Sequence, residues 1–365
     1  MIGRILGLYL ARRFTASVVM IFLACVSLIM VVDFLEMARR TAEREQVTST
    51  LLTLLTIYRA PAFTEQLLPF AVLFGAMGTF VVLSRRLELV VARAVGLSVW
   101  QFTAPAVLMA FLIGVLASTV FNPVSADFKE RANKIEGEIF STTPSGALLS
   151  TARKEFWIHF QNRDGQTILQ AQASQHSGRE LSGVVAFEFD AAGQFVERVE
   201  ARSAILGDGA WILNDAKVLV PGLEMASYNT YAIATNLDPR RVQETLIAPE
   251  TVSFWQLPAA IRGAEESGFG ALKYRLQLQI LLARPFLLVA MVLIAAVVGL
   301  RVFRFGGVGQ TILGGVAAGF LLYVGTKVAE DLGEAGVVHP VAAAWFPAVA
   351  GIILGVVVLL YREDG

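Results

Sequence analysis

The sequence has little of what a metalloenzyme or a disulfide-stabilised domain requires. It contains 365 residues but one cysteine, Cys25, and three histidines, His159, His176 and His339. A single cysteine cannot form an internal disulfide, and the histidines are not spaced as metal ligands, so Cys25 is expected to pack and no metal site is predicted. No Gly-x-Ser-x-Gly motif occurs, and no catalytic residue is predicted.

Nucleotide-binding motifs are also absent. The sequence has no Gly-x-x-x-x-Gly-Lys-[Ser/Thr] motif, and the dipeptide Gly-Lys does not occur. The chain is therefore not expected to hydrolyse ATP or to bind a cofactor by itself.

Long apolar segments dominate what is present. Hydrophobic residues make up 55% of the chain and charged residues 16%, and the mean hydropathy is +0.62. A hydrocarbon layer of about 30 Å needs about 20 apolar residues in a helix that crosses it. Six such spans are predicted, at residues 14–32, 61–83, 102–121, 281–300, 308–327 and 341–361.

The charged residues associated with these spans lie at the span ends. The residues concerned are Asp33, Arg284, Lys327, Glu330 and Asp331. Transporters that run on ion gradients usually have ionisable residues near the middle of the membrane. The pattern argues against a proton or sodium relay, so energy for any transport is expected from a partner protein.

Arginine placement predicts the orientation of the chain. With the N-terminus inside, nine arginines lie in the inner segments and four in the short outer connections. Because basic residues near span ends stay on the cytoplasmic side, both termini are predicted to be cytoplasmic. The long insert between the third and fourth spans then faces outward.

That insert is predicted to be a β domain. After a charged, helix-prone stretch at 126–140, short alternating runs separated by glycine-containing turns occur at 156–160, 167–171, 184–189, 195–206 and 210–220. Such spacing is typical of an antiparallel sandwich or a half-open jelly roll. The predicted domains are 1–140 with spans one to three, 141–258 with the jelly-roll-like sheet, and 259–365 with a connecting helix and spans four to six.

The inner loop between spans two and three, residues 84–96, contains an amphipathic pattern. Its apolar residues are Leu87, Val90, Val91 and Ala94, while Arg85, Arg86 and Arg93 face away and Glu88 lies on the flank. Ser84 is expected to cap this short helix and Gly96 to end it. From the residues alone, an interfacial helix with its arginines at lipid headgroups is the simplest interpretation.

The six-span layout and the loop sequence Leu87-Glu88-Leu-Val-Val-Ala-Arg-Ala-Val-Gly96 resemble the lipopolysaccharide export permeases, the LptF/LptG family, and within it the LptG branch. The resemblance covers essentially the whole chain. It implies a polytopic α-helical inner-membrane protein with a periplasmic jelly-roll-like domain. Its implied function is that of an ABC transporter permease subunit, not an enzyme, which extracts lipopolysaccharide and passes it to a periplasmic bridge during outer membrane biogenesis.

The resemblance also implies partners. A cytosolic LptB-like ATPase dimer, which uses ATP and Mg²⁺, would receive the inner loop as a coupling helix, with Glu88 contacting a basic residue. The residues implied at that contact are Glu88, Arg85, Arg86, Leu87, Val91 and Arg93. Further implied partners are an LptF-like paralogous permease, a single-span LptC-like protein and an LptA-like bridge protein.

Basic residues on the predicted outer side are candidates for binding the phosphates of the lipid. They are Arg39, Arg40, Lys129, Arg131 and Lys134. The resemblance matches Arg39 and Arg40 to a Lys-Lys pair and the other three by region only, and Asp33 departs from the family because an upstream lysine is acidic here. From the residues alone, pairing of Arg39 and Arg40 with Glu36 along one helix is the favoured interpretation.

Small residues in span five complete the candidates. Gly315-x-x-x-Gly319 allows close helix approach, and the resemblance places this pair at a seam facing the partner permease. The alternatives that remain are an LptF-type or other ABC-type permease and a non-transporting scaffold whose β domain binds an envelope protein.

Overall fold

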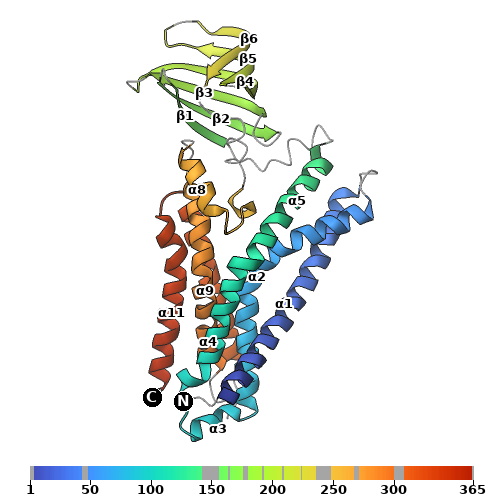
Figure 1. The fold of residues 1–365 in the computed structure, drawn as a ribbon, viewed down its shortest axis with the longest axis vertical. Helices are drawn as coiled ribbons and strands as arrows, with labels where there is room; N and C mark the ends of the chain where they lie inside the picture. Colours follow the sequence, from blue (N-terminus) through green and yellow to red (C-terminus); the bar gives the residue numbers. More distant parts are fainter. Residues whose placement is uncertain are drawn as a thin grey trace. The chain divides into compact units, whose positions relative to one another are not determined.

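The chain folds into long helices and one β-sheet (Figure 1). The computed structural model describes residues 4–42, 48–141, 156–162, 165–175, 180–190, 193–207, 209–222, 224–235, 248–266, 271–299 and 308–363. Two compact units result. The first comprises residues 1–135, 253–255 and 275–365, and the second comprises 136–252 and 256–274.

The first unit contains the six helices that are long and apolar enough to cross a membrane, as predicted. Its helices are α1 (Arg4–Thr41), α2 (Ser49–Arg85), α3 (Glu88–Ala94), α4 (Val99–Leu116), α9 (Leu272–Gly299), α10 (Val308–Glu334) and α11 (Pro340–Glu363). After α4 the chain continues through a π-helical turn, η1 (Ala117–Phe121), directly into α5 (Asn122–Ser141), which reaches into the second unit.

Several helices extend well beyond the predicted spans. Helix α1 has 38 residues, about 57 Å at about 1.5 Å per residue, which exceeds the hydrocarbon thickness of about 30 Å. The spans were predicted from hydropathy, which marks the part of a helix that lies in the hydrocarbon layer and not the residues where the helix begins and ends. Charged and polar residues continue α1 past its predicted span, and a mixed segment with leucines and threonines begins α2 before its predicted span.

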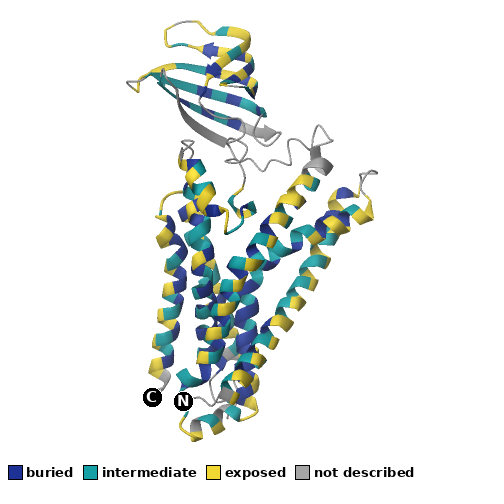
Figure 2. Ribbon diagram, in the orientation of Figure 1, coloured by how far each residue is buried: buried dark blue, intermediate teal, exposed yellow. Residues whose placement is uncertain are grey.

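Helix α2 lies at the centre of this unit. Of its most apolar stretch 72% is buried, against 6% for α1 and 17% for α10, and Figure 2 shows the same contrast between α1 and α2. Phe14, Leu73, Phe80 and Met291 belong to the packed core. Helices α4 and α9 also approach closely, because a Cβ built on Gly114 would lie 2.4 Å from the Cα of Pro285.

The second unit contains a six-stranded antiparallel sheet in which every strand pairs with the next, in the order β1 to β6. The strands are β1 (Phe156–Asn162), β2 (Gly165–Gln175), β3 (Glu180–Asp190), β4 (Phe195–Gly207), β5 (Ala210–Leu219) and β6 (Ala226–Ala234). The predicted antiparallel domain is confirmed, and β6 is an additional strand. The described strands form a simple meander without the crossovers of a jelly roll, so the jelly-roll character is not confirmed over these residues.

One face of the sheet carries its core. Buried Leu169, Leu181, Val199, Trp211 and Leu213 alternate with more exposed residues along β2 to β5, as the two-residue repeat of a strand requires. The connection that follows the sheet contains a 3-10 turn (Pro249–Thr251) and helix α8 (Leu257–Glu266).

Candidate functional site

Helix α3 is held between two tight turns. The predicted start at Ser84 is wrong, because Ser84 still belongs to α2. Leu87 then adopts a positive φ of 60° and α3 begins at Glu88. Its end agrees with the prediction: Gly96 has a φ of 85°, and the Leu97 N–H donates to the carbonyl of Ala92 at 3.1 Å, the closure expected of a helix that ends at glycine.

The apolar side of α3 is uncovered in the isolated chain. Leu87, Val91 and Val95 are 59%, 62% and 78% exposed. Val91 lies on α3, and Leu87 and Val95 lie just before and just after it; the three exposed residues are here called the α3 stripe. Arg85 and Arg86 are exposed beside it, whereas the side chain of Arg93, also predicted at this surface, lies outside the described residues.

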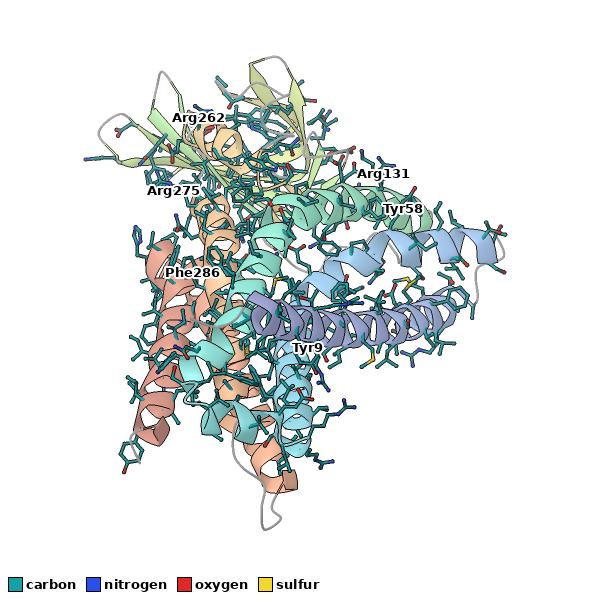
Figure 3. All side chains as sticks on the ribbon, turned by 60° about the horizontal axis from the view of Figure 1, so that its bottom comes forward. Tyr9, Tyr58, Arg131, Arg262, Arg275 and Phe286 are labelled. Atoms are coloured by element: carbon teal, nitrogen blue, oxygen red, sulfur yellow. The ribbon has the colours of Figure 1, made fainter. Side chains whose placement is uncertain are left out.

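Glu88 is bonded to helix α1. Its Oε1 accepts a hydrogen bond from Nη1 of Arg13 at 3.2 Å, and its Oε2 accepts one from the hydroxyl of Tyr9 at 3.2 Å. The Arg13 guanidinium also lies over the Tyr9 ring, 5.7 Å from its centroid. Tyr9, labelled in Figure 3, lies one helical turn before Arg13 on α1. Both carboxylate oxygens of Glu88 thus have partners within the chain.

Arg39 and Arg40 form the helix pairs that their spacing predicts. Nε of Arg40 lies 2.7 Å from Oε1 of Glu36, and Nη2 of Arg39 lies 3.3 Å from Oε2 of Glu36. The Arg40 side chain remains 56% exposed and the Arg39 side chain 80% exposed. Pairs of this kind contribute only a few tenths of a kcal/mol, roughly 0.2 to 0.5, so a stronger anionic ligand could displace Glu36.

The other basic candidates lie on α5. Arg131 pairs with Asp127 at 2.9 Å and Lys134 with Glu130 at 2.7 Å, both on exposed side chains, while Lys129 is half-buried. Arg131 also interacts with Tyr58 of α2, and Figure 3 shows these two residues close together.

The first half of α2 lies next to both basic groups. Tyr58 makes an edge-to-face ring contact with Phe128 of α5, at 5.4 Å between centroids. Its neighbour Arg59 pairs with Asp33 of α1 at 3.4 Å. The structure therefore places the end of α1 and the start of α5 against the same part of α2.

Asp33 is neutralised by Arg59. The side chains are 10% and 20% exposed, respectively, and within the described part of the chain no donor reaches Oδ2 of Asp33. Arg59 also lies over the ring of Phe63, at 5.3 Å. The acidic residue that departs from the family pattern is thus compensated by an arginine that sequence reasoning did not assign to it.

A buried polar network was missed by the sequence analysis. Glu65 of α2 forms an ion pair with Arg284 of α9, with side-chain exposures of only 11% and 14%. Nδ2 of Asn122 donates to Oε1 of Glu65 at 3.0 Å, and the Asn122 Oδ1 accepts from the backbone N–H of Phe254 at 3.0 Å. The network joins α2, α9, the start of α5 and the returning segment 253–255.

Gly315 and Gly319 lie at a helix contact inside the chain. A Cβ on Gly315 would meet Val298 of α9 at 2.6 Å, and one on Gly319 would meet Leu73 of α2 at 2.2 Å. Both glycines thus pack against helices of the same chain, and their expected position at a seam facing another permease stays a prediction. Their missing side chains let α10 approach α2 and α9.

The sheet carries its own pair of carboxylates. Glu188 of β3 lies directly opposite Glu197 of β4, and burial, followed by the charge of Glu197, raises the pKa of Glu188. The Tyr231 hydroxyl donates to Glu197, and burial together with this bond raises the pKa of Tyr231. Like charges directly opposite each other disfavour strand pairing, and the hydrogen bond from Tyr231 to Glu197 offsets part of this cost.

Taken together, six helices long and apolar enough to cross a membrane and an inserted β-sheet are consistent with a membrane permease that has an extramembrane domain. The family model described as lipopolysaccharide export system permease LptF/LptG matches residues 8–362, and the chain belongs to that family. Family membership and the six helices indicate an inner membrane protein.

Two relatives are similar to it over their whole length. They are the lipopolysaccharide export system permease proteins LptG of Escherichia coli strain K12 and of Escherichia coli O6:H1, strain CFT073. Each is 22% identical to this chain over 374 residues, which cover 98% of this chain and 99% of the relative.

Proposed function

We propose that this chain is the LptG-type permease subunit of an ABC transporter that extracts lipopolysaccharide from the inner membrane and passes it to a periplasmic bridge. A separate cytosolic ATPase dimer, using ATP and Mg²⁺, supplies the energy. The similarity to proteins named LptG supports this branch over the paralogous LptF type.

The uncovered α3 stripe carries the proposal. Three adjacent apolar side chains that are more than half exposed at a helix surface indicate a protein or lipid contact. We assign the ATPase as the occupant because Arg85 and Arg86 flank the stripe and Glu88 fixes the helix against α1, which gives the contact a defined orientation.

The proposed orientation follows from α1. Arg13, beside α3, and Arg39 lie on the same helix, and 26 residues at about 1.5 Å each separate them by about 39 Å. A bilayer is about 40 to 45 Å thick with its headgroups. The α3 stripe and the Arg39–Arg40 pair therefore belong on opposite membrane surfaces, and the excess of arginine in the inner segments puts α3 and both termini in the cytoplasm and the sheet in the periplasm.

Helices α1 and α10 bury little of their apolar surface within the chain, which supports a second permease packed against them. Only 6% of the most apolar stretch of α1 and 17% of that of α10 are buried within the chain. We propose that the LptF-like paralogue contacts these helices and that lipid enters between them. Closure of the ATPase dimer would then move α3, narrow the space between the permeases and drive the lipid toward the sheet, the LptC-like partner and the LptA-like bridge.

Val91→Asp tests the ATPase contact. Placing a carboxylate in an apolar interface is costly, so we expect at least a tenfold loss of the co-expressed P-loop ATPase in affinity purification, a change of about 1.4 kcal/mol or more. Val337→Asp is the matched control, because Val337 is 72% exposed in the turn before α11 and should retain the ATPase. Equal retention by both variants would favour a non-transporting scaffold.

Arg39→Glu combined with Arg40→Glu tests the lipid contact. Reversing two exposed charges should reduce photocrosslinking to lipopolysaccharide at least threefold, since phosphates are then repelled. Glu36→Gln is the control, because it removes the carboxylate that holds both arginines and should keep or increase crosslinking. Unchanged crosslinking in the double variant would leave the arginines with a role in helix pairing alone.

A further inference from the structure

The contact between Glu88 and α1 has a role that docking alone does not require. If Glu88 served only to meet a basic residue of the ATPase, its carboxylate would be expected to point away from the chain. Instead both of its oxygens accept hydrogen bonds from α1, and its side chain is 32% exposed while that of Arg13 is 21% exposed.

The three side chains form a closed set. Nη1 of Arg13 donates to the Tyr9 hydroxyl as well as to Glu88, and the Tyr9 hydroxyl donates to Glu88. Because Tyr9 and Arg13 are one turn apart on α1, they present two donors side by side to a single carboxylate. Such a charge-assisted pair with a second donor fixes the direction of the carboxylate as well as its distance. This set is called the α1–α3 latch below.

Covalent connection alone would leave α3 loosely placed. Arg86 and Leu87 connect α2 to α3, and Leu87 has a positive φ. Gly96, which follows α3, also has a positive φ. The apolar side chains Leu87, Val91 and Val95 are largely exposed, whereas Ala92 of α3 packs against the core of the helical unit. Among the described residues, the latch adds hydrogen bonds and an ion pair between α3 and α1, which packing of the small Ala92 side chain does not supply.

We infer that Tyr9 and Arg13 are positioning residues, which hold α3 to the cytoplasmic end of α1 so that a displacement of α3 is passed directly to α1. The inference rests on the proposed function of α3 as the ATPase-docking helix. Helix α1 is suited to respond, because it is the least covered of the six membrane helices. The ATPase grips the α3 stripe, and the latch carries the movement to α1.

The isolated chain tests the latch without any partner. In a Cys25→Ala background, spin labels at Val91 on α3 and Leu8 on α1, both exposed, report the distance between the two helices by electron paramagnetic resonance. We expect Arg13→Gln to broaden the distance distribution at least twofold and Tyr9→Phe to broaden it less. Arg12→Gln, which removes the same charge from an exposed neighbour, should leave it unchanged, and an Arg13→Gln distribution equal to wild type would overturn the inference.

The assembled complex tests the consequence for transport. Arg13→Gln should retain the ATPase and hydrolyse ATP within twofold of wild type, yet release at least fivefold less lipopolysaccharide per ATP. Arg13→Lys, which keeps the charge, should recover at least half of that ratio, and Arg12→Gln should match wild type. A wild-type ratio in Arg13→Gln would overturn the inference.

Failure of the latch and failure of ATPase docking give different results. Absence of any bound ATPase from the wild-type complex would refute the proposed function, while the spin-label result would still decide whether the latch positions α3. If Arg13→Gln lowers the thermal midpoint of the whole chain, Tyr9→Phe, which removes one hydroxyl, replaces it in both assays.

Discussion

Glu65→Leu is expected to lower the free energy of unfolding of the helical unit by about 3 to 5 kcal/mol, because it leaves a buried charge without its partner. Arg284 is only 14% exposed and pairs with Glu65, and Asn122 would lose its acceptor as well. Unfolding in mild detergent, followed by circular dichroism, measures the change.

The double variant Glu65→Leu with Arg284→Leu separates pairing from packing. Removing both charges should recover most of the loss, since an apolar pair of similar volume is often as stable as a buried ion pair. Glu36→Leu is the exposed control, and breaking its surface pairs should cost less than about 1 kcal/mol. A double variant as unstable as Glu65→Leu would show that Arg284 is not left uncompensated in the single variant.

Gly114→Ala is the second large effect. The added Cβ would lie 2.4 Å from the Cα and 3.0 Å from the N of Pro285, so backbone atoms, which cannot rotate away, would have to move. Overpacking of this kind costs about 1 to 3 kcal/mol and occasionally more. The helices α4 and α9 are expected to separate, and the thermal midpoint should fall.

Gly325→Ala is the matched glycine control. Gly325 lies within α10, and nothing is within 4 Å of a Cβ built on it. Alanine favours a helix over glycine by up to about 1 kcal/mol, so this variant should be neutral or slightly more stable. If both glycine variants had the same effect, the close approach of α4 and α9 would not limit stability.

The spans were predictable because a bilayer imposes one length on every apolar helix. The helix ends were not, since Glu36 to Thr41 and Ser49 to Ala60 continue α1 and α2 with residues that hydropathy assigns to connections. Strand β6 was missed for a related reason. Strand β6 lies at the edge of the sheet, where few of its residues are buried. The two-residue alternation that predicted the other strands is therefore weak in β6.

Pairings between distant residues were not predictable from one sequence. Glu65 and Arg284 are 219 positions apart, and Glu88 and Arg13 are 75 positions apart, so neither pair leaves a local pattern. The i, i+4 pair of Glu36 and Arg40 was predictable because both residues belong to one helix. Gly315 and Gly319 were correctly expected at a helix contact, but spacing does not reveal which helix fills it.

The π-helical turn η1 changes how this segment can vary among related chains. It accommodates one residue more per turn than an α-helix, and one residue corresponds to a rotation of about 100°. Gly114 before the turn packs against Pro285, and Phe128 after it packs against Tyr58. A relative that lacked this residue would present every later side chain of α5 in a different direction, so an ungapped alignment there would pair residues that are not structural equivalents.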